Sequence, residues 1–163
     1  MNALRVPSIL VFILIFSFSV FLASCENSAS AEEEEHSDPF GVALILNGVE
    51  IAKQENGIVS YAEGENITLA AGSETDLITI RFIAEDGDRF VPDESEGYGL
   101  EWLVGNESIT EVEQHAEDGA WSFHLVGLAA GDTDVRFGLL HNDHADFTSL
   151  PFEVQVTEAV AGN

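Results

Sequence analysis

The stretch from Ala120 to Leu140, AWSFHLVGLAAGDTDVRFGLL, contains two runs in which apolar and polar residues alternate. A glycine-bounded segment, Gly127–Gly131, separates the two runs. Alternation with a period of two is typical of a strand with one buried face, and a glycine-rich turn between two such runs indicates an antiparallel hairpin. We therefore expect the runs to pair with each other. Their apolar members are Trp121, Phe123 and Leu125 in the first run and Val135, Phe137 and Leu139 in the second.

Similar runs occur along most of the remaining chain. Asn47-Gly48 separates two of them, Val42–Leu46 and Val49–Ile51, and Asn-Gly is a preferred two-residue hairpin turn. Further strands are predicted at 58–62, 65–70, 76–84, 99–104, 106–114 and 150–157. No convincing amphipathic helix of about ten or more residues interrupts them. Many short strands separated by turn residues predict an all-β fold, a β-sandwich.

The first 24 residues have the pattern of a secretory signal. Arg5 supplies the positive charge, and the apolar run Ser8–Phe21 is short for a membrane span. The end of this segment, Leu22-Ala23-Ser24-Cys25, resembles the bacterial lipobox at all four positions. The resemblance implies cleavage before Cys25 and lipidation of its thiol and amino group, which anchors a protein stably. The alternative is an uncleaved anchor helix with an incidental cysteine.

Residues 25–39 are predicted to form an acidic, disordered tether, because Glu26–Pro39 is polar and lacks apolar periodicity. The sandwich is then expected at 40–158, followed by a tail at 159–163. In some bacteria an aspartate after the lipidated cysteine is associated with retention in the inner membrane. Glu26 stands there in this chain, so we expect an outer-membrane anchor with the domain facing the periplasm or the medium.

The chain is strongly acidic, with a net charge of −25. Loss of the signal with Arg5 would leave 30 acidic and four basic residues, a net charge of −26. Binding to nucleic acid or to an anionic bilayer surface needs basic patches, so this composition argues against both. The scarcity of lysine and the even spread of acids resemble exported proteins of salt-loving bacteria, with an acidic calcium-binding surface as the alternative.

A family resemblance appears in Leu100–Val112, LEWLVGNESITEV, which is similar to the tryptophan-then-valine strand pair of group 2 bacterial immunoglobulin-like domains. In that family a Gly-Leu-x-x-Gly-x-Thr turn and an apolar strand follow. The matching positions here are Gly127, Leu128, Gly131, Thr133, Val135 and Phe137. The resemblance covers about Ile67 to Val156 and leaves Phe40–Ala62 as extra N-terminal strands.

The resemblance implies an immunoglobulin-like β-sandwich without catalytic residues, used as a surface spacer, adhesion or binding module. The sequence also lacks the G-x-S-x-G motif and a phosphate-cradling glycine loop. We therefore expect a non-enzymatic, lipid-anchored envelope protein that serves interaction or structure, with an unknown protein or envelope partner and no cofactor.

A second hypothesis is a periplasmic lipoprotein that binds zinc or copper. In the segment 141–146, two histidines stand three residues apart, with one aspartate between them and one after them, and imidazole and carboxylate groups are common ligands of zinc and copper. These residues are His141, Asp143, His144 and Asp146. The alternative is a polar loop with a turn at Asn142-Asp143.

The expected hairpin points to a third histidine. If its strands pair, His141 lies opposite Asp118, at the end of the sandwich where His115 is expected. His124 would then lie ~20 Å up the ladder and remain on the solvent face. The predicted metal set is therefore His115, His141 and His144 with the two aspartates.

A weaker candidate for calcium is the turn Glu85-Asp86-Gly87-Asp88, in which Asp86 and Asp88 flank a glycine. The chain lacks the EF-hand glutamate at the spacing this turn would need, and Asp-Gly is preferred in ordinary turns.

The charge predicts a salt-dependent stability. Exposed carboxylates repel one another over a Debye length of about 10 Å at 0.1 M salt and about 3 Å at 1 M. The melting temperature should therefore rise steeply with sodium chloride concentration, as measured by circular dichroism. A melting temperature that stays flat across this range would contradict the interpretation of the chain as salt-adapted.

Overall fold

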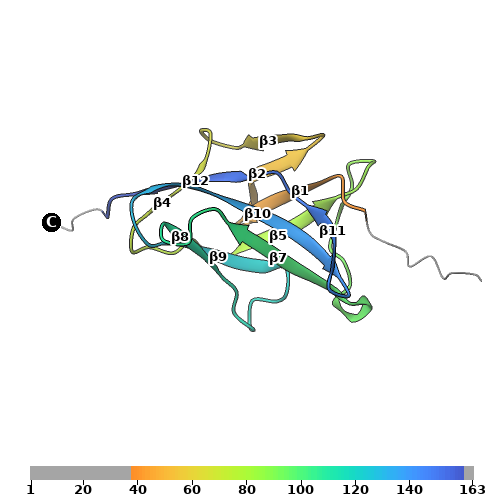
Figure 1. The fold of residues 1–163 in the computed structure, drawn as a ribbon. Helices are drawn as coiled ribbons and strands as arrows, with labels where there is room; N and C mark the ends of the chain where they lie inside the picture. The colour runs from red at the N-terminus through yellow and green to blue at the C-terminus, as the bar shows by residue number, and fades with distance from the viewer. Residues whose placement is uncertain (1–37, 160–163) are drawn as a thin grey trace, which may run out of the picture. The chain divides into compact units, whose positions relative to one another are not determined.

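Two Asn-Gly turns organise the beginning of the fold. The computed structural model describes residues 38–159 (Figure 1). In it Asn47 and Asn56 both have φ of 51°, and the glycines after them have φ of 79° and 74°. Positive φ at both central residues is what a type I′ hairpin turn requires, and asparagine and glycine tolerate it best. These turns join β1 (Gly41–Leu46), β2 (Val49–Glu55) and β3 (Ile58–Tyr61) into an antiparallel meander.

The rest of the described chain is almost entirely strand. One short 3₁₀ helix, η1 (Glu94–Glu96), precedes β7. The remaining strands are β4 (Ile67–Ala70), β5 (Ile78–Ile83), β6 (Arg89–Phe90), β7 (Tyr98–Val104), β8 (Thr110–Glu113), β9 (Ser122–Gly127), β10 (Gly131–His141), β11 (His144–Thr148) and β12 (Phe152–Thr157).

The strands form two sheets that pack face to face. The first has the order β3-β2-β1-β5-β9-β8, with β6 paired to β5. The second has the order β11-β10-β12-β4, with β7 paired to β10. The order β5-β9-β8 matches strands B, E and D of an immunoglobulin domain, and β7-β10-β12 matches C, F and G. The predicted all-β, immunoglobulin-like sandwich with extra N-terminal strands is therefore confirmed.

The hairpin predicted for the two alternating runs within Ala120–Leu140 is wrong. Both runs are strands, β9 and β10, but β9 pairs with β5 and β8, whereas β10 pairs with β7, β11 and β12. The segment between them crosses from one sheet to the other, and the Leu128 amide donates to the Ile109 carbonyl across 2.8 Å. Alternation identified the buried face of each strand but not its partner, because both strands point their apolar residues into the same interlayer space.

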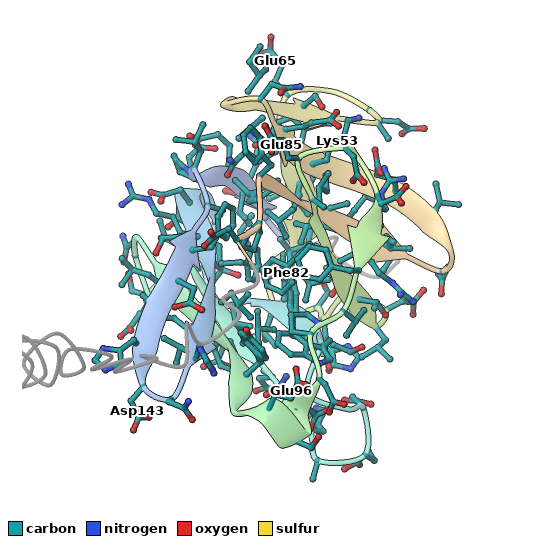
Figure 2. The ribbon with its side chains drawn as sticks, turned by 90° about the vertical axis from the view of Figure 1, so that its right-hand side faces the viewer. Lys53, Glu65, Phe82, Glu85, Glu96 and Asp143 are labelled. Carbon is teal, nitrogen blue, oxygen red and sulfur yellow. The ribbon has the colours of Figure 1, made fainter. Side chains whose placement is uncertain are left out.

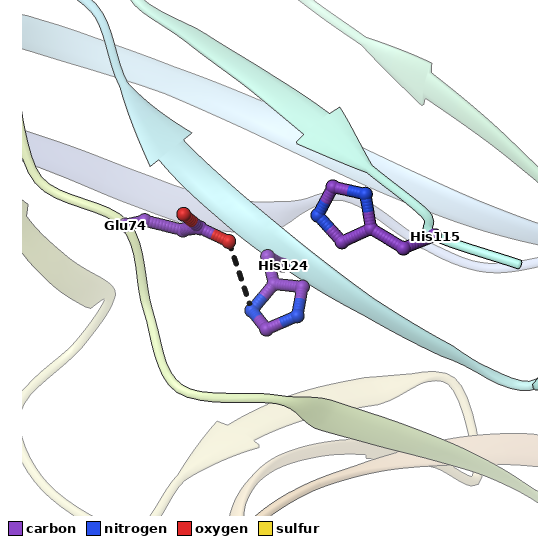
Figure 3. Close-up of side chains that lie close together, drawn as sticks. All are labelled: Glu74, His115 and His124. Atoms are coloured by element: carbon purple, nitrogen blue, oxygen red, sulfur yellow. Dashed lines mark ion pairs between the residues drawn. The ribbon is translucent and has the colours of Figure 1, made fainter. Parts of the chain in front are cut away.

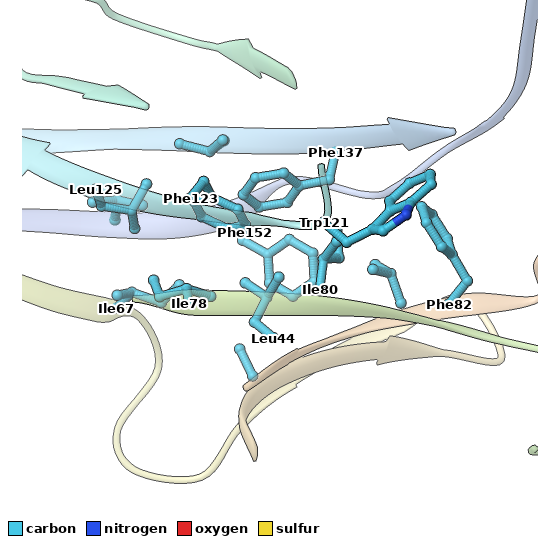
Figure 4. Packing of buried hydrophobic residues seen from close by; sticks show 14 of the residues in the cluster. Leu44, Ile67, Ile78, Ile80, Phe82, Trp121, Phe123, Leu125, Phe137 and Phe152 are labelled. Carbon is cyan, nitrogen blue, oxygen red and sulfur yellow. The ribbon is translucent and has the colours of Figure 1, made fainter. Parts of the chain in front are cut away.

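The core lies between the sheets (Figure 4). Phe137 of β10 is fully buried, and its ring centroid lies 4.7 Å from that of Phe123 in the first sheet and 6.0 Å from that of Phe152 in its own. Phe82 packs edge-on against Trp121 at 5.7 Å, which places this tryptophan in the core.

No aspartate or glutamate among residues 38–159 is a buried residue, although the side chains of Asp118 and Asp146 are largely covered. In Figure 2, Glu65, Glu85, Glu96 and Asp143 project from the edges and loops of the domain, and Phe82 lies between the layers.

Some predictions fall on residues without a described structure. The signal peptide, Cys25 and the tether up to Ser37 lie outside the described residues, as does the tail from Val160. Within residues 38–159, no helix has the length and apolar character needed to cross a bilayer.

Phe137→Ala should destabilise the domain by about 3–5 kcal/mol, because it leaves a cavity between the two sheets. The matched control is Leu103→Ala on β7, where the side chain is 60% exposed. Its cost should stay within about 0.5 kcal/mol. Urea unfolding at constant high salt measures both values, and similar losses for the two variants would contradict this packing.

Candidate metal centre

The register of β8 against β9 brings two histidines together on the outer face of the first sheet. Phe123 and Leu125 of β9 point into the core, so His124 between them points outward. Glu113, the last residue of β8, lies directly opposite His124, and His115 follows two residues later, just past the end of the strand. The ring centroids of His115 and His124 are 5.5 Å apart.

Glu74 reaches the same place from the connection between β4 and β5. This connection runs along the other side of β9, where Glu74 forms an isolated bridge with Val126. The Thr75 amide donates to the Leu125 carbonyl over 2.9 Å, and the Leu125 amide donates to Thr75 Oγ1 over 3.0 Å. As a result, Glu74 Oε1 lies 3.2 Å from His124 Nδ1, the ion pair drawn in Figure 3.

The imidazole of His124 is held at both nitrogens. Its Nδ1 lies 2.9 Å from the Thr75 carbonyl oxygen, which only accepts, so Nδ1 carries a proton. Its Nε2 lies 3.4 Å from Asp118 Oδ2. The hydrogen bond to Thr75 raises the pKa of His124 above 6.5, and the charges of Glu74 and Asp118 add to this effect while desolvation opposes it.

Glu74, His115 and His124 form a compact set of possible metal ligands. One ligand atom from each lies within 4.8 Å of the other two, and no other group of three or more is as close among residues 38–159. The side chains of Glu74 and His115 are about half exposed, at 45% and 46%, whereas His124 is only 15% exposed. The cluster thus combines one largely buried side chain with two that are open to solvent.

The predicted set of His115 with His141 and His144 is wrong. His141 ends β10 and lies opposite His144 of β11 in the second sheet, whereas His115 lies beside His124 on the first. The set rested on pairing β9 with β10, which does not occur. His124, expected ~20 Å from such a site on the basis of that pairing, instead lies beside His115.

The other predicted ligands, at 141–146, take part in packing and in a hairpin turn. His141 is buried and stacks on Tyr98 with ring centroids 4.4 Å apart, and its Nδ1 lies 3.7 Å from Asp146 Oδ2. Asn142 and Asp143 have φ of 47° and 68° and form the tip of the β10–β11 hairpin, which confirms the predicted turn. Asp143 and His144 are exposed there.

The turn predicted as a weak calcium site is held by hydrogen bonds among its own residues. Asp86 Oδ1 accepts a hydrogen bond from the Asp88 amide at 3.0 Å, and the Gly87 amide donates to the Ala84 carbonyl. This is the local bonding of an ordinary Asx turn.

Comparisons with known proteins add little to this description. No family model matches the chain, and no curated protein matches it. A solved structure that resembles it is titled "Crystal structure of the S-layer protein SbsC domains 4 and 5". The two are 11% identical with a TM-score of 0.40, and the match covers 64% of this chain and 63% of that one. The chain therefore spans less than two thirds of that structure.

His124 should titrate above pH 6.5 in metal-free protein. Because folding raises its pKa, the stabilisation is complete below about pH 6.5 and is lost as the pH rises through the folded-state value. NMR titration should show Glu74→Gln and Asp118→Asn each lowering this pKa. The stability difference between the wild type and His124→Gln should shrink over the same window, and a His124 pKa below 6.5 would contradict this electrostatic description.

Proposed function

We propose that this chain is a lipid-anchored protein of the bacterial envelope whose sandwich serves as a non-enzymatic interaction or structural module. The observation that carries the proposal is Leu22-Ala23-Ser24-Cys25, directly behind a signal-like apolar run. In a lipobox this cysteine is the acylation site, and each buried methylene adds about 0.8 kcal/mol of membrane affinity.

The segment between Cys25 and the sandwich supports such an arrangement. Residues 26–39 contain six acidic residues and no lysine or arginine. Their acidic side chains repel an anionic membrane surface, which favours a domain that stands away from the lipid. In Figure 1 the chain enters the sandwich at one end and leaves at the opposite end, a layout suited to a module that extends from its anchor.

The strand order supports an interaction or structural role in a more general way. The proposed relation to group 2 bacterial immunoglobulin-like domains rests on Trp102, Val112 and the turn from Gly127 to Thr133. Immunoglobulin-like sandwiches serve many unrelated functions, so the fold agrees with the proposal without selecting a partner. We place the anchor in the outer membrane because Glu26, rather than aspartate, follows Cys25.

Cys25→Ser should abolish acylation, because it removes the thiol that receives the lipid. Metabolic labelling with a radioactive fatty acid measures this effect. The matched control is Ser24→Ala, which keeps a small residue before the cysteine and should remain labelled and membrane-bound. A Cys25→Ser protein that still carries the radioactive label would contradict lipidation at Cys25.

A further variant tests the choice of membrane. Glu26→Asp should move the labelled protein from the outer to the inner membrane fraction while leaving acylation intact. Wild-type protein found in the inner membrane would contradict the outer-membrane placement but not the anchor.

A further inference from the structure

We propose that Glu74, His115 and His124 bind a divalent transition-metal ion of the zinc or copper type on the outer face of the first sheet. This site is distinct from the one expected at 141–146, and it does not depend on the lipid anchor. Two imidazoles and a carboxylate form a donor set that zinc and copper accept readily, whereas calcium and magnesium favour oxygen ligands.

The ligand atoms of the three side chains lie close enough together that only small side-chain movements are needed to bind one ion. Zinc lies about 2.0–2.2 Å from nitrogen and oxygen ligands, so two ligand atoms on one tetrahedral ion lie about 3.4 Å apart. Glu74 Oε1 and His124 Nδ1 are already 3.2 Å apart. The largest separation in the set stays within 4.8 Å, so a small rotation of the exposed His115 ring closes the site.

Asp118 completes this arrangement from behind His124. A metal ion on Nδ1 takes the place of the Nδ1 proton, which moves to Nε2 in a neutral ring or is released to solvent from a doubly protonated one. The bound imidazole then carries its single proton on Nε2, which faces Asp118 Oδ2 at 3.4 Å. That oxygen is buried, and no donor other than the His124 ring lies within hydrogen-bond reach of it. Metal-bound histidines commonly donate their second N–H to a carboxylate, which orients the ring. Asp118 is thus a positioning residue. The Thr75 carbonyl, 2.9 Å from Nδ1, gives up its hydrogen bond to the ring when an ion binds there, so the His124 ring must turn slightly away from it.

The surrounding charge favours a cation. Besides Glu74 and Asp118, Glu113 lies nearby with its Oε2 3.8 Å from His115 Nε2. A divalent ion would offset this concentration of negative charge, and the net charge of the chain raises the local concentration of cations.

The test is isothermal titration of Zn²⁺ into the purified full chain after removal of metals with a chelator. We expect binding of one ion at this site, weakened by about tenfold or more in both His115→Ala and Glu74→Gln. Asp118→Asn should weaken it by about 10- to 100-fold without removing a ligand. In parallel, Zn²⁺ should raise the melting temperature of the wild type more than that of each variant.

Two histidine variants serve as controls. His144→Ala removes an exposed histidine from the β10–β11 hairpin, and His36→Ala removes the histidine beside the run Glu32–Glu35. Both should bind as the wild type does. The proposal is overturned if Zn²⁺ binds no tighter than about 1 mM, if His115→Ala and Glu74→Gln bind as well as the wild type, or if the controls lose binding to the same extent. His115 and Glu74 are exposed, so both variants should fold, and their circular dichroism checks this.

Discussion

The two sheets depend on aromatic contacts in the space between them. Phe137 of the second sheet meets Phe123 of the first, and Phe82 with Trp121 extends the same buried layer. The chain has a single cysteine and therefore forms no internal disulfide, so burial of apolar surface must offset the repulsion among 30 acidic side chains. Segregation of phenylalanine inside and carboxylate outside is therefore the basis of this fold.

The fold class was predictable from local patterns, whereas the strand partners were not. Asn47-Gly48 identified a hairpin, and the alternation around Phe123 and Phe137 identified two strands and their buried faces. Strand pairing depends on the path of the segment that connects the two strands. Here the Leu128 amide donates to the Ile109 carbonyl, and the segment crosses into the other sheet. The expected metal set was wrong because it was derived from that pairing.

The observed cluster could be predicted only in part. The alternation of β9 places His124 outward, whereas His115 lies past the end of β8, where no strand periodicity applies. Glu74 belongs to an irregular connection that carries no periodic signal. It reaches β9 through backbone bonds such as the one from the Gly127 amide to the Ser73 carbonyl, which depend on tertiary structure. Burial of His141 against Tyr98 likewise arises from packing that the polar sequence 141–146 does not reveal.

The parallel pairing of β4 with β12 has a consequence for the order of folding. Ile67 aligns with Val154, and the Ala71 amide donates to the Thr157 carbonyl. The early strand β4 therefore finds its partner in this sheet only in β12, near the end of the described chain. Closing a loop that contains most of the domain costs entropy before any contact is gained, and folds with such distant pairings form slowly. The second sheet is therefore completed only when the chain is available through Thr157, so the domain reaches its final structure after synthesis of this strand and not while the chain is still growing toward it.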